Sequence, residues 1–529
     1  MKFPIGIQSF ERIISEGYAY VDKTDMLYSL VTDGAIYFLS RPRRFGKSLL
    51  VSTLKNYFLG RKELFKGLKI ESLEKDWNVH PVFHLDFNSD SFTNSGTLEN
   101  TLESYVSGWE KQYNVTPNRE LSTGRRFASV IRAAHAQTGR RCVVLIDEYD
   151  KPLLDVMNLP DTVERNNAMV SLEDYNREIL KSFYSTFKLA DSDLQFVFLT
   201  GVTKFSQLSV FSGFNQPNDI SMAPQYETIC GMTDEEIDSY FREPIGRMAE
   251  MSGCAYDEER DLLRRQYDGY HFSGRMRGVY NPFSLLNALR NMVVDDYWFR
   301  TGTPSYLVRL LNGFGDKLNE LVGKYYAQSQ FEDYRADIQQ PLPMIYQSGY
   351  LTIKEFDRDM RTFKLDFPND EVKNGFVTMV ANSYLDGKHD AGSVVRDLVR
   401  SLKNHDLEAF RASFDTFLAS IPYDVRRKAD ERERERDFTY TLYLIFRIAS
   451  CYTTYIEKRQ SYGRLDCAIV TSDSAYVFEF KLDGSAAEAL AQINAMGYAD
   501  EFKSAGRKIY KIGLSISSAT GRLADWMVE

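Results

Sequence analysis

FLSRPRRFGKSLL, at residues 38–50, decides the fold of the first half of this 529-residue chain. The apolar run 35–40 predicts a buried strand, and the pattern after it predicts a helix that begins near Lys47. A phosphate-binding loop needs backbone N–H groups aimed at the phosphates, a lysine that reaches the β and γ oxygens, and a hydroxyl for magnesium. Gly46, Lys47 and Ser48 supply that end of the pattern, so the sequence predicts a nucleotide site on a parallel α/β sheet.

An acidic strand end downstream fits the same site. In RRCVVLIDEYDKP, at 140–152, an apolar run leads directly into Asp147 and Glu148. In such an arrangement the aspartate holds magnesium, together with Ser48, and the glutamate orients or deprotonates the attacking water. The alternative is that GKS is only a helix cap and IDE an ordinary strand end.

The strand LQFVFLTGVTKFS, at 194–206, offers Thr200 or Thr203 as a polar residue that contacts the γ-phosphate. Basic residues surround the loop as well, and Arg41 stands where the usual pattern has its first glycine. The guanidinium groups of Arg41, Arg43 and Arg44 either clamp the phosphates or pair with Asp147 or Asp150 when the site is empty. We expect Arg44 to contact the nucleotide.

A second pattern lies near the C-terminus, in GRLDCAIVTSDSAYVFEFK at 463–481. Two apolar segments joined by a short polar turn predict a hairpin that brings Asp466 and Glu479 together across neighbouring strands. Lys481 follows Glu479 by two residues and therefore shares its face. Two carboxylates that hold a divalent cation and a lysine that activates water suit phosphodiester hydrolysis. The alternative is a buried Asp–Lys ion pair.

The GRxD…ExK residues resemble the PD-(D/E)XK nuclease superfamily, and this resemblance implies a further glutamate, for which spacing does not separate Glu457 from Glu435. Gly463 and Arg464 are expected to set the turn into the strand, and Arg464 has two open roles, a phosphate contact or a structural ion pair. Glu457 is the residue that we add to the expected catalytic set.

The composition of the chain limits which partners its surface can bind. A net charge of −9 argues against attraction of nucleic acid to the whole surface, so any such contact must be a confined basic patch. The alternating charges of 426–437 fit a solvated helix face better than a nucleic-acid contact. Five cysteines without a CxxC pair indicate reduced thiols in a cytoplasm, and no apolar run approaches the ~18 residues of a membrane span.

The segments between the two patterns divide the chain. TDEEIDSYF at 233–241 has capping-box spacing and opens a helical region, and two predicted strands, 350–356 and 362–367, resemble the wing of a winged helix. The expected domains are a nucleotide-binding core at 1–240, a helical and winged-helix-like region at 241–385, a helical linker at 386–420 and an α/β domain at 421–529; the resemblances below imply a P-loop ATPase for the first and a restriction-endonuclease-like fold for the last.

Several motifs together resemble a known family. RPRRFGKS, IDEYDKP, LTGVTKFS, YDGYHF, NPFS, TGTPSYL and QSGYLTI are similar to the bacterial AAA-ATPase-like family with an arginine- and proline-rich loop. The C-terminal GRxD…ExK, followed by a helix with Gln492 and Tyr498, resembles the PD-(D/E)XK nuclease superfamily. The sequence leaves open whether YDGYHF is a structural turn or contacts the nucleotide.

These resemblances imply an ATPase that uses ATP and Mg²⁺, coupled to a Mg²⁺-dependent nuclease that acts on nucleic acid, with DNA the expected substrate. Self-association into a homo-oligomer is a further expectation. The alternative is a nucleotide-gated switch or DNA-binding regulator whose nuclease fold is inactive.

Overall fold

The computed structural model forms two compact units, Met1–Val372 and Lys373–Glu529. The residues that the structure describes are 1–157, 159–165, 168–204, 217–302, 321–332, 341–376, 397–398, 400–420, 453–460, 463–471, 473–500, 502 and 507–529.

The first unit is built around a parallel sheet in the order β2-β3-β6-β1-β7. Its strands are β1 (Ile36–Ser40), β2 (Val82–Asp86), β3 (Cys142–Asp147), β6 (Leu194–Gly201) and β7 (Asn218–Asp219). Every residue of β3 is buried, as expected of a central parallel strand covered on both faces. The sheet confirms the predicted α/β class.

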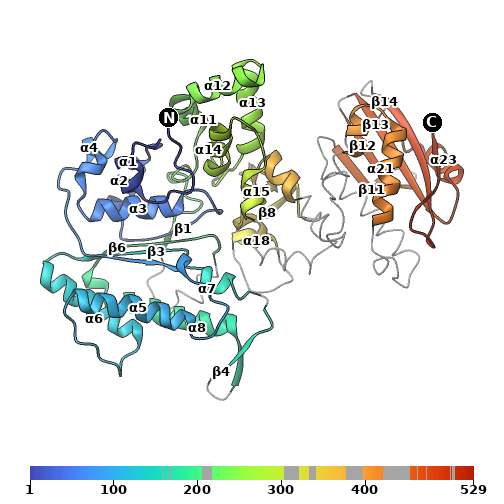
Figure 1. Ribbon diagram of the computed structural model, residues 1–529. Coiled ribbons are helices and arrows are strands. Elements are labelled where there is room, and N and C mark those ends of the chain that lie inside the picture. The colour runs from blue at the N-terminus through green and yellow to red at the C-terminus, as the bar shows by residue number, and fades with distance from the viewer. Residues whose placement is uncertain are drawn as a thin grey trace. The chain divides into compact units, whose positions relative to one another are not determined.

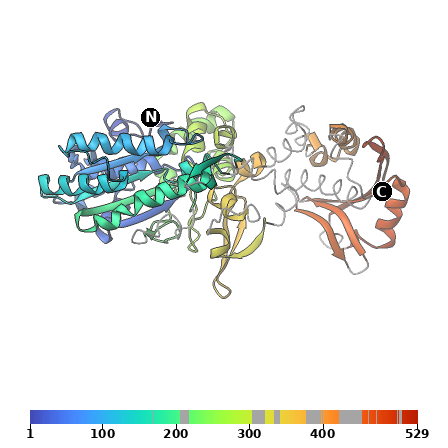
Figure 2. The same ribbon diagram turned by 90° about the horizontal axis from the view of Figure 1, so that it is seen from below.

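Helices cover both faces of this sheet (Figure 1). On one side lie α1 (Phe10–Ser15), α2 (Thr24–Asp33), α3 (Lys47–Phe58) and α4 (Ile70–Leu73). On the other side lie α5 (Thr97–Gln112), α6 (Thr123–Thr138) and α8 (Leu172–Tyr184), which run side by side in Figure 2. Shorter elements connect these parts, namely α7 (Lys151–Leu154), α9 (Thr186–Leu189) and the hairpin of β4 (Thr162–Arg165) and β5 (Ala168–Ser171).

A helical region follows the sheet. It contains α11 (Asp234–Tyr240), α12 (Arg242–Ser252), α13 (Tyr256–Tyr267), α14 (Pro282–Asn291) and α15 (Tyr297–Gly302). The predicted capping box is present, because the Thr233 hydroxyl accepts from the Glu236 N–H and the Glu236 carboxylate accepts from the Thr233 N–H. Apolar residues of α11 to α14 form one buried cluster.

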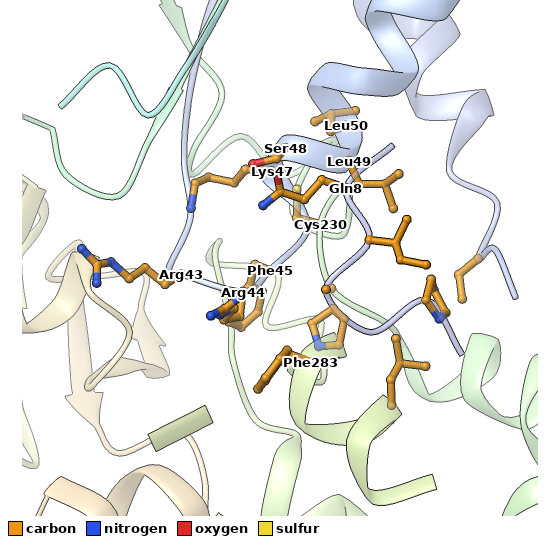
Figure 3. A pocket seen from close by; sticks show the side chains of 18 of the residues that line it. Gln8, Arg43, Arg44, Phe45, Lys47, Ser48, Leu49, Leu50, Cys230 and Phe283 are labelled. Carbon is orange, nitrogen blue, oxygen red and sulfur yellow. The ribbon is translucent and has the colours of Figure 1, made fainter. Parts of the chain in front are cut away.

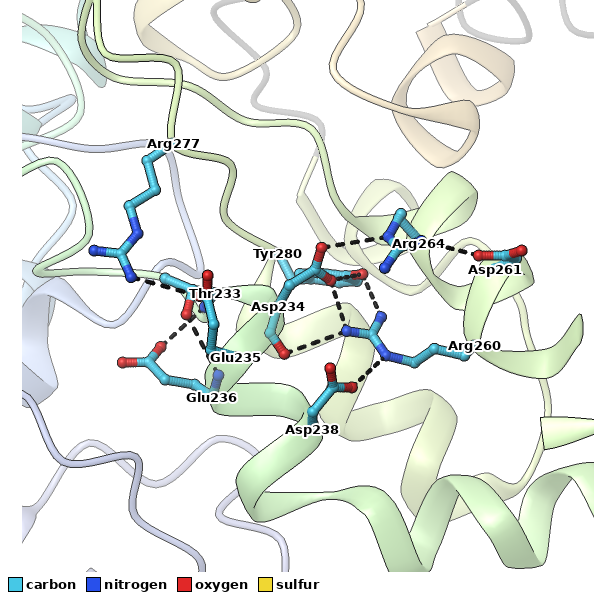
Figure 4. A network of polar contacts seen from close by, with 10 residues as sticks. All are labelled: Thr233, Asp234, Glu235, Glu236, Asp238, Arg260, Asp261, Arg264, Arg277 and Tyr280. Atoms are coloured by element: carbon cyan, nitrogen blue, oxygen red, sulfur yellow. Dashed lines mark hydrogen bonds and ion pairs between the residues drawn. The ribbon is translucent and has the colours of Figure 1, made fainter. Parts of the chain in front are cut away.

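Arg260 of α13 ties this region together (Figure 4). Its side chain is 6% exposed and donates to Asp234 Oδ1 at 2.6 Å and to Asp238 Oδ1 at 2.9 Å. The Tyr280 hydroxyl also donates to Asp234 Oδ1, at 2.7 Å. A buried guanidinium with two carboxylates is fully paired, so this network fixes α11 against α13.

The last part of the first unit is a three-stranded antiparallel sheet in the order β8-β10-β9. Its elements are β8 (Lys324–Ala327), α17 (Gln328–Glu332), α18 (Leu342–Gln347), β9 (Thr352–Asp357) and β10 (Thr362–Asp366). The two predicted strands are β9 and β10, and β8 adds a third strand that the sequence reading missed. A winged helix stays a prediction.

The second unit contains a mixed sheet in the order β11-β12-β13-β14-β15. Its strands are β11 (Thr453–Gln460), β12 (Gly463–Val470), β13 (Ser474–Leu482), β14 (Lys508–Ile516) and β15 (Leu523–Val528). β13 and β14 are parallel and are joined through α23 (Ala486–Ala495), and the other neighbours are antiparallel. α21 (Leu407–Ser420) packs Phe410 against Phe478, whereas Val477 faces the cluster that includes Ile493 of α23.

In the part of the chain that the structure describes, none of the helices combines the length and the apolar character that crossing a bilayer requires.

Candidate nucleotide site and candidate nuclease site

The phosphate loop connects β1 to α3. Gly46 is the N-cap of α3 and has φ 92°, a left-handed conformation that favours glycine. The first N–H groups of α3 have no partner within the helix, so this end of the helix is suited to an anion. Gly46, Lys47 and Ser48 all line one cavity.

Lys47 is bonded to the loop itself. Its side-chain ammonium donates to Arg41 O at 3.0 Å and to Pro42 O at 3.1 Å, and the residue is 5% exposed. A bound phosphate would compete with these two carbonyls for the ammonium.

Arg41 does not lie where the sequence suggested. Its guanidinium is directed into backbone carbonyls, with 2.9 Å to Ser40 O, 2.8 Å to Ser221 O and 3.1 Å to Tyr226 O, and it stacks 4.0 Å from the Phe272 ring centroid. It therefore neither clamps a phosphate nor pairs with Asp147 or Asp150. Arg41 is 1% exposed, and burial lowers its pKa. The residue that replaces the first glycine of the pattern fixes the start of the loop.

Arg44 and Phe45 point to different surroundings. Arg44 has φ 67°, is exposed, lines the cavity and lies 4.9 Å from the Phe283 ring centroid. Phe45 is buried between two rings of the YDGYHF motif, 4.7 Å from Tyr270 and 5.7 Å from Phe272. Neither Tyr270 nor Phe272 lines the cavity, so the structure favours a structural role for YDGYHF.

Asp147 and Glu148 end β3 beside the loop. Asp147 is 3% exposed, and burial raises its pKa to about 6, although a hydrogen bond from Ser48 and the charge of Lys47 lower it. Glu148 has φ 52° and lines the cavity. The Ser48 hydroxyl and the Asp147 carboxylate, which are in contact, form a donor set that suits Mg²⁺.

The two threonines of β6 and its extension differ. Thr203 donates its hydroxyl to Asp150 Oδ2 at 2.8 Å, so that hydroxyl is used to join the end of β6 to the segment after β3. Thr200 is fully buried, and its hydroxyl has no hydrogen-bond partner among the described residues. Thr200 does not line the cavity described below, so its contact with a phosphate stays a prediction.

The cavity itself has a volume of about 430 Å³, within the usual range for a small-molecule site. Besides the loop, its walls include 4–8 and 229–232, two segments that the sequence reading did not single out, and Pro282 and Phe283 of the NPFS motif at the start of α14. Figure 3 shows Lys47, Ser48 and Gln8 close together, with Arg44 and Phe45 beside Phe283. The mostly apolar segments at 4–8 and 229–232 carry no motif, so only the fold reveals them.

In the second unit, the predicted hairpin is formed by β12 and β13. Cys467 pairs with Phe478, so the next pair along the strands is Asp466 with Glu479. Asp466 Oδ2 accepts from the Phe480 N–H at 3.0 Å. The structure thus brings the two predicted acids to one place on the sheet.

Glu479, Lys481 and Gln492 form a polar cluster between β13 and α23. The Gln492 amide donates to Glu479 Oε1, and Lys481 donates to Gln492 Oε1 at 2.6 Å. Lys481 Nζ lies 3.6 Å from Glu479 Oε1. Glu479 is 1% exposed, and its other carboxylate oxygen, Oε2, has no hydrogen-bond partner among the described residues. Burial and the Asp466 charge raise the pKa of Glu479. A carboxylate oxygen without a partner, next to a second carboxylate, suits a divalent cation.

The remaining predicted residues are less fully described. Glu457 lies in β11, where only the backbone is described, and the pairing of Ile456 with Cys467 places its backbone opposite Asp466. Glu435 lies outside the described residues, as do 426–437, and the side chain of Arg464 is not described. Tyr498 is 2% exposed in the apolar cluster beside α23. Within the described ranges no three His, Cys, Asp or Glu side chains form a metal-binding group.

Fold and sites together define an α/β P-loop ATPase core followed by a nuclease-type α/β domain. Residues 4–211 match the family model described as predicted AAA-ATPase, and residues 433–526 match the PD-(D/E)XK nuclease superfamily. An uncharacterized protein of the vnfD 5′ region of Azotobacter chroococcum mcd 1 is 34% identical over 540 residues, covering 100% of this chain and 99% of that protein. The chain belongs to this AAA-ATPase-like family with a C-terminal PD-(D/E)XK nuclease superfamily domain.

Two solved structures give weaker likenesses. The Orc1 protein of Aeropyrum pernix in complex with DNA is 12% identical over 67% of this chain and 90% of its own, with a TM-score of 0.23. Cdc6p of Pyrobaculum aerophilum is 13% identical over 68% of this chain and 96% of its own, with a TM-score of 0.22. Scores this low carry no argument about the site or its ligand.

Proposed function

We propose that this protein binds and hydrolyses ATP in the first unit and cleaves nucleic acid, with DNA as the substrate, at a Mg²⁺ site in the second unit. The observation that carries the ATP site is the 430 Å³ cavity, which joins the start of α3 to Glu148 and to apolar walls from three other segments. Such a cavity offers donors for phosphates at one end and apolar surface for a base elsewhere.

Each residue has a distinct role in this proposal. Lys47 transfers its hydrogen bonds from the loop carbonyls to the phosphates, and Ser48 and Asp147 hold Mg²⁺. Glu148 orients the water that attacks the γ-phosphate, as its position on the cavity wall allows. Arg44 and Thr200 contact the phosphates.

Two variants separate ATP binding from hydrolysis. Lys47→Ala should weaken ATP binding more than tenfold, because a hydrogen bond to a charged group contributes about 1.5–3 kcal/mol. Glu148→Gln should keep binding and lower turnover by about 10²–10⁴. Titration calorimetry and phosphate release measure the two effects, with the exposed Lys62→Ala as a control. Unchanged turnover in Glu148→Gln would contradict the role of Glu148.

The nuclease proposal is carried by the meeting of Asp466, Glu479 and Lys481. The carboxylates hold Mg²⁺ together with Glu457, and Lys481 orients or activates the attacking water. The matched control for Lys481→Ala is Lys508→Ala, because Lys508 is exposed at the start of β14. Cleavage that persists in Lys481→Ala would contradict the proposal.

One observation favours a second function. Gln492 bridges Glu479 and Lys481, so the three side chains already bond to one another. A nucleotide-gated regulator with an inactive nuclease fold would keep this closed arrangement. It predicts ATP binding without cleavage of plasmid, single-stranded DNA or RNA, and no gain from Gln492→Ala.

A further inference from the structure

A tryptophan from another helix forms a hydrogen bond to the phosphate loop. The indole Nε1 of Trp298, in α15, donates to Arg43 O at 3.0 Å. Trp298 is 1% exposed, so its indole N–H has no access to water as an alternative acceptor. Its hydrogen bond thus fixes a loop carbonyl immediately beside the two carbonyls that Lys47 holds.

A buried carboxylate holds this tryptophan in turn. The backbone N–H of Trp298 donates to Glu371 Oε1 at 2.6 Å, and the Ser284 hydroxyl donates to the same oxygen at 3.0 Å. Ser284 lies in α14, directly after the cavity-lining Phe283. Glu371 therefore joins α15, the cavity wall and its own segment.

Glu371 lies at the end of the first unit. Glu371 belongs to helical residues 370–376, and the first unit ends at Val372. The link Arg43–Trp298–Glu371 consequently runs from the phosphate loop to the segment through which the chain enters the second unit.

The loop is also packed against neighbouring segments and is not free to move alone. Gly349 has φ 89°, and a Cβ built there would lie 2.6 Å from Pro42 Cβ. Phe45 is enclosed by Tyr270 and Phe272. A phosphate that takes the Lys47 ammonium from Arg41 O and Pro42 O would change the hydrogen bonds of the peptides directly next to the Arg43 carbonyl that Trp298 holds.

We propose that Trp298 and Glu371 are positioning residues that couple the phosphate loop to residues 370–376, so that ATP binding regulates the nuclease unit through this link. This inference rests on the proposed ATP and nuclease functions. It differs from them in naming residues that contact neither nucleotide nor nucleic acid.

The test compares full-length wild type with Trp298→Phe and Glu371→Gln at saturating ATP and Mg²⁺. Phe keeps the ring but removes the indole donor, and Gln keeps an oxygen acceptor while removing the carboxylate. Trp77→Phe and the exposed Glu355→Gln are matched controls in the same unit. Hydrogen exchange of residues 370–376 and plasmid cleavage are both measured with and without ATP.

In wild type and controls, ATP should change exchange at 370–376 and change cleavage by about fivefold or more, the lower end of ordinary coupling between sites. Trp298→Phe should bind ATP and keep basal cleavage but lose both responses, and Glu371→Gln should reduce them. An unaltered ATP response in Trp298→Phe overturns the inference, as does ATP binding that leaves exchange at 370–376 unchanged in wild type.

Calorimetry and the exchange measurement separate this failure from failure of the proposed function. Absence of ATP binding in wild type contradicts both proposals. If ATP binds but nothing is cleaved, the nuclease proposal fails, and an exchange response that depends on Trp298 still supports the link from the loop to residues 370–376.

Discussion

The two candidate sites differ in how far the protein's own groups satisfy the hydrogen bonds and charges of their polar side chains. In the nucleotide site, Lys47 and Arg41 are bonded to backbone carbonyls, and a cavity adjoins them. In the nuclease site, Glu479 is buried with one oxygen that lacks a partner, and Lys481 and Gln492 only partly compensate it. The first site is built by protein hydrogen bonds, whereas in the second the protein leaves a buried carboxylate oxygen without a partner, where we propose that Mg²⁺ binds.

The largest effect should come from Arg41, which tests whether the nucleotide site is built by the protein. Arg41→Met leaves buried carbonyls without their donor and should lower the free energy of unfolding of the first unit by on the order of 2–4 kcal/mol. Arg44→Met, at an exposed position, should change it by less than about 0.5 kcal/mol but weaken ATP binding. Urea unfolding and ATP titration of both variants check this, and equal stabilities would contradict the structural role of Arg41.

Removal of Mg²⁺ tests the proposed metal site in the nuclease unit. Mg²⁺ at 100 times its Kd should stabilise the second unit by about 2.7 kcal/mol, since a ligand that binds only the folded state adds this much. Glu479→Gln should lose that response and, in EDTA, be at least as stable as wild type, because it removes a buried charge. Thermal unfolding with EDTA or Mg²⁺ measures both. A variant that responds to Mg²⁺ as wild type does would remove Glu479 from the metal site.

Glu371, at the end of the first unit, predicts a pH dependence. Burial raises the pKa of Glu371 to about 8, so between its usual value and pH 8 the folded protein keeps a proton that the unfolded chain has lost. Stability should therefore fall as the pH rises through this window, by up to about 1.4 kcal/mol per pH unit. Glu371→Gln should remove this slope and Glu355→Gln should keep it. Denaturant midpoints at pH 6, 7 and 8 decide the matter; parallel curves for wild type and Glu371→Gln contradict it.

The smallest effect concerns Thr200 of β6. Its buried hydroxyl has no partner among the described residues, so Thr200→Val should leave stability unchanged or raise it by up to about 1 kcal/mol. ATP turnover should fall because the contact to phosphate is lost. Thr203→Val should instead destabilise, since Thr203 bonds to Asp150. Reduced stability with normal turnover in Thr200→Val would assign the hydroxyl to the fold.

Motifs with strict local geometry were readable from the sequence. The loop from β1 to α3, the acidic end of β3 and the β12–β13 hairpin depend on periodicity and turn residues over short spans. The capping box at Thr233 and Glu236 is equally local and is confirmed.

Contacts between residues that lie far apart in the sequence could not be predicted from it. Arg41 looked like a phosphate ligand because charge beside a loop suggests one, whereas two of its carbonyl partners, Ser221 O and Tyr226 O, lie 180 and 185 residues away. The Arg43–Trp298–Glu371 link and the cavity wall at 4–8 likewise depend on packing between distant segments. β8 was missed because a four-residue strand has too little pattern to detect.

The most direct test of the account incubates purified protein and Mg²⁺ with plasmid, single-stranded DNA and RNA, with and without ATP, beside Lys481→Ala and Lys47→Ala. The account predicts cleavage in wild type, a loss of at least about 100-fold in Lys481→Ala, and an ATP effect that disappears in Lys47→Ala. Absence of cleavage of every substrate, with ATP still bound, would contradict a coupled ATPase and nuclease and support a nucleotide-gated regulator.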